Sequence, residues 1–92
     1  MGEHGPFNSL HEAENTPAVR AIYDKVRDPK TPQGTLRDLS SGLILEACEA
    51  AGIELGSQDR STITWLGNWE PYQCQVIAGL IWRAAGAGSG RG

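Results

Sequence analysis

Residues 71–85 read PYQCQVIAGLIWRAA, and this stretch decides the fold that the sequence predicts. Pro71 suits the first turn of a helix, where a missing backbone N–H costs nothing, and Gly86 is placed to end the helix. Apolar residues recur at helical spacing along one face, formed by Cys74, Ile77, Leu80, Ile81 and Ala84. We therefore predict a helix over about 71–85 that buries this face.

The opposite face of this helix is uncharged, although surface helices normally carry charges there. Arg83 is the only formal charge between Pro71 and Ala85. Either the helix is central and covered by other helices or the N-terminal arm, or the face binds a protein partner or a second copy, with aromatic anchors. The predicted partner-binding residues are Tyr72, Gln75, Val76, Gly79, Trp82 and Arg83.

Three further helices are predicted before this one. Thr16-Pro17 signals a helix start, and Asp28-Pro29 a helix end. Thr35 with Asp38 approximates a capping box and opens a helix over about 36–51, with an apolar face of Leu36, Leu39, Leu43, Ala47 and Ala50 flanked by Ile44. Gly52 followed by an apolar residue predicts a Schellman stop for that helix.

Ser57 is expected to cap a short helix of about nine residues with Ile63, Trp65 and Leu66 on its buried side. Trp65 and Trp69 bracket the next turn, and Trp69 is placed to pack on Cys74. Tryptophans so close together also suit a ligand cage, but a small core needs their apolar area, so we predict burial.

The predicted fold is all-α, a small four-helix domain over 16–85, because no segment alternates with period two. Residues 1–15 are expected to form a flexible arm, and 86–92 a Gly-rich, disordered tail. Phe7 and Leu10 are large enough to latch the arm onto the domain instead. With 92 residues, 39% of them hydrophobic, the chain suits one domain.

Composition and charge limit the classes of partner and the cellular location that we expect for this chain. The net charge of −3 lacks the basic excess that nucleic-acid binding uses, and no apolar run or leader pattern indicates a membrane or export, so we expect a cytoplasmic protein. Cys48 and Cys74 lie in helical segments and are expected to be reduced and buried, with a single bridge between helices as the alternative.

Catalytic signatures are missing from the sequence. His4 and His11 lie in the arm, far from either cysteine, so neither a metal site nor a cofactor is predicted. Nucleophile-elbow, phosphate-loop and dinucleotide motifs do not occur. We expect a non-enzyme that acts as a protein-interaction or accessory module.

The alternative function is DNA binding by a helix-turn-helix. The last two predicted helices have suitable lengths, and Tyr72, Gln73 and Gln75 would project from the first turns of a recognition helix. The acidic balance of the chain argues against this alternative.

One resemblance rests on several motifs between residues 43 and 85. They are Ala47-Cys48-Glu49-Ala50-Ala51-Gly52, Leu55-Gly56, Asp59-Arg60, Trp65-Leu66, Trp69-Glu70-Pro71, Cys74, Val76-Ile77-Ala78-Gly79-Leu80-Ile81 and Arg83-Ala84. This pattern resembles short uncharacterised helical proteins of actinobacteria and their phages. The resemblance implies an intracellular accessory protein and assigns no catalytic or binding residue.

Overall fold

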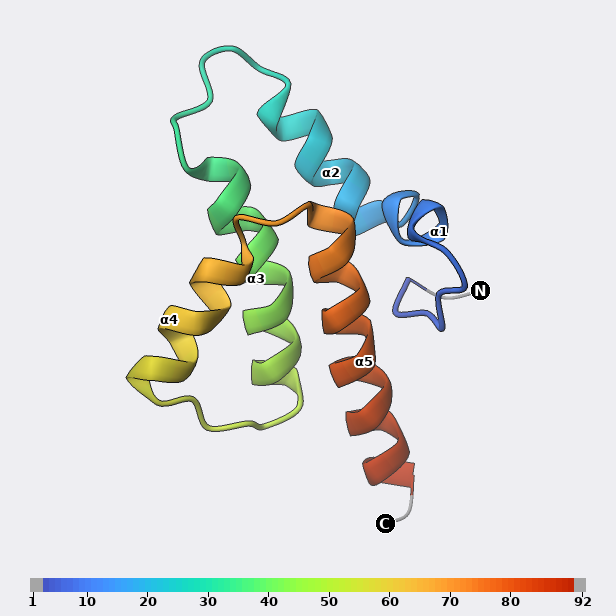
Figure 1. Ribbon diagram of the computed structural model, residues 1–92. Coiled ribbons are helices and arrows are strands. Elements are labelled where there is room, and N and C mark those ends of the chain that lie inside the picture. Colours follow the sequence, from blue (N-terminus) through green and yellow to red (C-terminus); the bar gives the residue numbers. More distant parts are fainter. Residues whose placement is uncertain (1–2, 91–92) are drawn as a thin grey trace.

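The computed structural model describes residues 3–90, and within this range all regular structure is helical (Figure 1). The elements are α1 (Leu10–Glu14), α2 (Pro17–Val26), α3 (Thr35–Ala50), α4 (Ser57–Leu66) and α5 (Pro71–Gly90). The all-α prediction is confirmed. The four predicted helices are present, and α1 is a fifth that the sequence analysis missed, because its five residues are too few to show a period.

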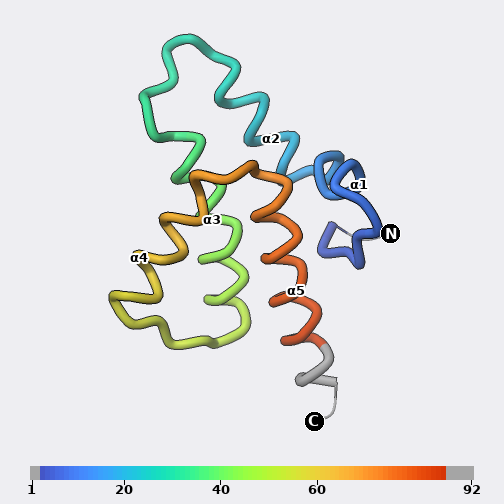
Figure 2. Tube along the Cα trace, in the orientation of Figure 1, coloured from blue at the N-terminus to red at the C-terminus, as the bar shows by residue number. Residues whose placement is uncertain are grey.

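α5 lies in the middle of the molecule (Figure 1). α3 and α4 lie on one side of it, and α1 with the N-terminal residues lies on the other. The trace in Figure 2 shows α2 near the N-terminal end of α5, where it joins the two sides. The principal extents of 47 × 33 × 16 Å describe a flat molecule, so α5 has flanking neighbours but is not enclosed on every side.

Several helix ends were predicted correctly from the residues that lie at those ends. Thr16 caps α2 by accepting a hydrogen bond from the Val19 N–H, and Pro17 is the first residue of the helix. At the end of α3, Gly52 takes a left-handed φ of 72°, and the Ile53 N–H donates to the Cys48 carbonyl at 3.0 Å. The predicted Schellman stop is confirmed, as is the start of α5 at Pro71.

Two predicted caps were wrong. Gly34, with a φ of 88°, is the N-cap of α3, while the Thr35 hydroxyl donates backwards to the Pro32 carbonyl. Gly56 is the N-cap of α4, and its N–H donates to the Asp59 carboxylate at 2.9 Å. At both helix starts the glycine is the N-cap and the following hydroxyl residue is the first helical one, and at Gly34 the left-handed φ favours glycine.

The predicted end of α5 at Ala85 was also wrong, because the helix continues to Gly90. A glycine ends a helix when it adopts a left-handed φ, and Gly86 does not. Of the predicted tail, residues 91 and 92 lie outside the described range.

The core lies where α3, α4 and α5 meet. Ile44, Cys48, Ile63 and Cys74 form its buried cluster, surrounded by partly buried leucines and isoleucines. Cys48 and Cys74 are both buried free thiols.

The buried face of α3 differs from the predicted one. It consists of Ser40, Ser41, Ile44, Ala47 and Cys48, whereas Leu36 and Ala50 are exposed. The reason lies at the turn after α4, where a side chain on Gly67 would meet the Arg37 backbone and the Ser41 side chain. The small side chain of Ser41 allows this close approach, so the turn after α4 packs on the side of α3 that carries Arg37 and Ser41. On α5, Leu80 and Ala84 are likewise exposed instead of buried.

Two glycine substitutions test this packing. In Gly67→Ala, the added methyl has no space between α3 and α4, so we expect a loss of roughly 1–3 kcal/mol in the free energy of unfolding. Gly42→Ala is the matched control, because nothing lies within 4 Å of its Cβ position in the interior of α3. Helix propensity then predicts a gain of up to about 1 kcal/mol. Urea unfolding followed by circular dichroism measures both, and equal effects would contradict the close approach.

Candidate partner-binding site

Part of the predicted partner face of α5 is covered in the structure by residues 3–7, which belong to a segment of residues 3–9 that we call the arm. The Gln75 side-chain amide donates to the Glu3 carbonyl, and Gln75 is only 3% exposed. The Trp82 ring stacks on the His4 ring with centroids 4.5 Å apart and planes 18° from parallel. A Cβ on Gly79 would lie 2.6 Å from the His4 carbonyl oxygen. Gln75, Gly79 and Trp82 therefore form an arm face, as expected if α5 is a central helix covered by the arm.

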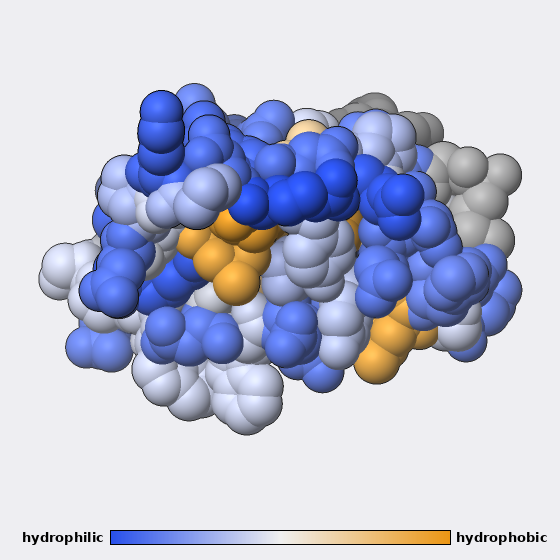
Figure 3. Space-filling view, turned by 90° about the horizontal axis from the view of Figure 1, so that it is seen from above, coloured by the Kyte–Doolittle hydropathy of each residue, from blue (hydrophilic) through white to orange (hydrophobic). Residues whose placement is uncertain are grey.

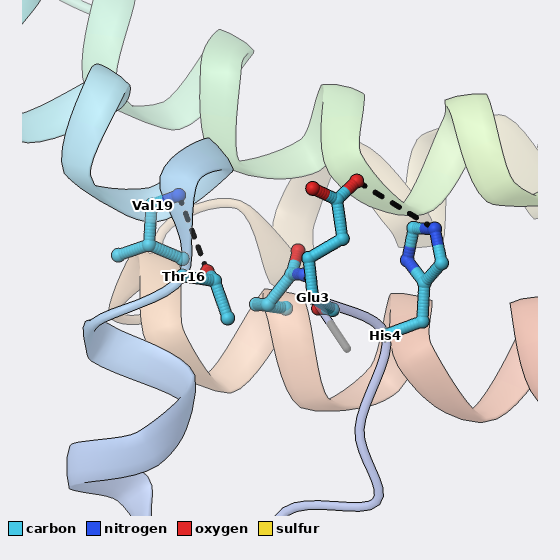
Figure 4. A network of polar contacts seen from close by, with 5 residues as sticks. Glu3, His4, Thr16 and Val19 are labelled. Carbon is cyan, nitrogen blue, oxygen red and sulfur yellow. Dashed lines mark hydrogen bonds and ion pairs between the residues drawn. The ribbon is translucent and has the colours of Figure 1, made fainter. Parts of the chain in front are cut away.

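Figure 4 shows how the arm begins. Glu3 and His4 lie side by side near α3, with 3.6 Å between Glu3 Oε1 and His4 Nε2, while Thr16 caps the start of α2 nearby. Phe7 follows, with its ring beside Gly79. Residues 3–15 are thus in contact with the domain, as in the latched alternative, and Ala13 of α1 is fully buried.

The other three predicted partner residues have different surroundings. Tyr72 lies close enough to Tyr23 to affect its ionisation, the Arg83 Nε donates to the Gly79 carbonyl one turn back, and Val76 lines a different surface. The six residues therefore do not share one exposed face.

A separate apolar groove runs along α5 between α4 and α1, with a volume of about 340 Å³. We call it the tryptophan groove. Its lining residues are Leu10, Trp65, Leu66, Trp69, Gln73, Cys74, Val76 and Ile77. Its hydrogen-bonding side-chain groups are the Gln73 amide, the indole N–H donors of the two tryptophans and the buried Cys74 thiol, so the groove offers a partner few hydrogen bonds.

The predicted burial of Trp65 and Trp69 was wrong, because they are 57% and 53% exposed. Their rings meet edge to face, with centroids 5.9 Å apart, and form one wall of the groove. α4 packs mainly on α3 through its Ile63 side, so no element covers the side that carries Trp65. The sequence feature that indicates this exposed pair is the spacing of two tryptophans four residues apart across a turn. The ligand-cage alternative rests on the same feature.

The surface at the α2 end of the molecule has a different character. In Figure 3, which looks onto this end, apolar side chains reach the surface only in small separate areas among hydrophilic ones. Within the described residues, the groove combines the largest exposed aromatic side chains with an apolar lining.

Negative charge gathers near the N-terminal end of α5. The pKa of Tyr23 is raised, first by burial and then by the nearby carboxylates of Glu70 and Glu14 and by Tyr72. Glu70 directly follows Trp69, and Glu14 lies one helical turn after Leu10. Both carboxylates therefore lie near Tyr23 at this end of α5, where Glu14 lines a surface hollow together with Arg20 and Arg27.

Cys74 lies at the floor of the groove and is 1% exposed. Its Sγ donates to the Leu66 carbonyl at 3.4 Å, and burial raises the pKa of the thiol. The neutral thiol is a poor nucleophile, so this cysteine has the properties of a core residue.

The residues predicted to read DNA are not presented together. Gln75 is buried against the arm, Gln73 lines the tryptophan groove, and Tyr72 lies at the acidic end of α5. A recognition helix must present such side chains freely to base edges, next to phosphate-binding cations.

No protein-family model matches the chain, and no curated protein or solved structure is significantly similar to it. Among the described helices, none combines the length and the apolar character needed to cross a membrane. The residues from 3 to 90 hold no group of three or more His, Cys, Asp or Glu arranged to bind a metal ion.

The buried thiol predicts an alkaline weakening of the fold. An unfolded chain loses the Cys74 proton near the ordinary pKa of 9.0, whereas the folded chain holds it to higher pH. The folded state then binds more protons, so the free energy of unfolding falls as the pH rises above about 9. Urea titrations over this pH range measure the slope. Cys74→Ala should reduce it, while Cys48→Ala, which keeps Cys74, should retain it; equal slopes in both variants would contradict this origin.

Proposed function

We propose that this protein is a non-catalytic interaction module that binds an amphipathic helix of another protein in the tryptophan groove. The observation that supports this most strongly is the exposure of Trp65 and Trp69 beside an apolar groove. Contiguous exposed apolar surface is costly for a small protein and usually belongs to an interface. Tryptophans are also the side chains that most often dominate binding energy.

A helix suits the groove better than an extended chain does. An extended segment exposes its backbone N–H and C=O groups and needs partners for them when it is buried. The groove offers the Gln73 amide and the two indole N–H donors for this purpose, which are too few for both the N–H and the C=O groups of an extended segment. A helix satisfies its own backbone and needs only an apolar stripe, as in other helix-in-groove complexes.

The charges around the groove favour one kind of helix. Glu14 and Glu70 flank the N-terminal end of α5, and the chain carries a net charge of −3. A Lys or Arg at the matching end of the partner helix would pair with these carboxylates and speed association. A second copy of this acidic chain is a less favourable occupant.

The non-catalytic character is part of the same proposal. Cys74 is buried as a neutral thiol, His4 is stacked on Trp82, and His11 contacts the side chain of Asn15. None of these groups forms a nucleophile–base pair of the kind that covalent catalysis requires. Two buried free thiols also suit the reducing cytoplasm, where we place the protein.

The test uses a synthetic amphipathic peptide of about five helical turns, with Leu at helical spacing and Lys at one end. Trp65→Ala and Trp69→Ala should each weaken its binding by roughly 30-fold, which corresponds to about 2 kcal/mol. They should change the melting temperature little, because each residue is more than half exposed. Ile53→Ala is the matched control, since Ile53 is 47% exposed and does not line the groove. Fluorescence anisotropy of a labelled peptide measures the affinities.

A scrambled peptide of the same composition separates a helix site from general stickiness. Equal binding of both peptides, or equal losses in Trp65→Ala and Ile53→Ala, would overturn the proposal. Glu14→Gln with Glu70→Gln should reduce the salt dependence of binding, because it removes the carboxylates that attract Lys. Tight binding to duplex DNA with a steep salt dependence would instead support the helix-turn-helix alternative.

A further inference from the structure

We propose that the arm is an exchangeable ligand, and that the arm face of one chain binds the arm of a second copy. This inference concerns the side of α5 formed by Gln75, Gly79 and Trp82, and it goes beyond the proposed helix-binding groove. The structure shows the intramolecular version of this complex, in which residues 3–7 contact the arm face of their own chain.

Three contacts of different kinds define the arm face. Gln75 donates its side-chain amide to a backbone carbonyl, which an extended chain offers at every residue. Trp82 presents its ring to the His4 imidazole.

Gly79 provides the third contact by leaving space for the arm backbone. The His4 carbonyl and the Phe7 ring both lie where a Cβ at position 79 would be. All three contacts involve residues 3–7 alone, so an arm can make them whichever chain it belongs to.

The contacts also indicate that the arm is held weakly. Within the described residues, the arm forms no ion pair with the rest of the chain, and its Glu3 Oε1 and His4 Nε2 atoms lie 3.6 Å from each other. The buried His4 Nδ1 has no hydrogen-bond partner, which reduces the free energy gained on docking. Glu3 and Glu46 of α3 line the same cleft of about 210 Å³, so an acidic residue of α3 borders the docked arm.

A second copy is the occupant that these features favour. Its arm carries the same residues in the same order, so it reproduces the contacts without any change in either chain, as in domain swapping. The chain's own arm competes at an effective concentration of about millimolar, which is typical of short tethers. A wild-type chain should therefore exchange arms only when its concentration approaches this value.

Two full-length variants remove this competition. The first, His4→Ala with Phe7→Ala, loses the arm contacts but keeps an open arm face. The second, Gly79→Ala, keeps a normal arm but blocks its own face, because the new methyl meets the His4 backbone. Each variant alone should be monomeric in sedimentation velocity, whereas an equimolar mixture should form a one-to-one dimer with a Kd below about 1 mM.

Further variants assign the dimer to the correct surface. Adding Trp82→Ala to the first variant should abolish the complex, since it removes the ring that stacks on His4. Adding Trp65→Ala should leave the complex unchanged, because this residue belongs to the groove, so failure of one proposal does not decide the other. If Gly79→Ala does not fold, a synthetic peptide of residues 1–9 replaces it as the arm donor. A mixture that stays monomeric at about 1 mM, or a peptide that leaves the Trp82 indole NMR signal unshifted at that concentration, would overturn the proposal.

Discussion

The packing of α5 against α3 is the interaction on which the rest of the structure depends. Ile44 and Cys48 of α3 meet Cys74 of α5, and all three are nearly inaccessible to solvent. This contact joins segments about thirty residues apart and gives α4 a surface on which to pack. Beside this contact, Gly67 and Ser41 allow the turn after α4 to approach the α3 backbone closely. A larger side chain at these positions would separate the helices and open the core.

α5 carries a single formal charge, so its sides need to be covered by other parts of the chain. α3 covers only one of them. The flat arrangement leaves two further sides of α5 without a long helical neighbour. One of them is covered by the arm, which reaches the helix backbone at Gly79. The other remains open as the tryptophan groove, where Trp65 and Trp69 are more than half exposed. A chain of 92 residues has little apolar area from which to build a core. Two exposed tryptophans therefore do not contribute the stability that their burial would provide.

The two surfaces of α5 suit different kinds of ligand because their chemistry differs. The groove is lined by apolar side chains and has a single amide, so it suits a chain whose backbone hydrogen bonds are already made. The arm face places the Gln75 amide next to a glycine, so it suits an extended backbone that needs a donor and close approach. The proposed helix-binding groove and the proposed segment-binding face therefore occupy one helix without sharing residues. Binding at either surface would still act on the same core, since both rest on α5.

The sequence by itself determined the all-helical fold and several helix ends. Signals such as Thr16-Pro17, Gly52 and Pro71 act within one or two turns, so no distant contact was needed to interpret them. The uncharged side of α5 was also evident, together with its two explanations. Tertiary structure alone decided which side chains are buried, because burial depends on segments that the helical period cannot locate. Gln75 is buried by Glu3, which lies 72 residues earlier, and Trp65 is exposed because α4 packs through its Ile63 side. An apolar face predicts that a helix needs a neighbour, but only the three-dimensional packing determines whether the chain itself supplies one.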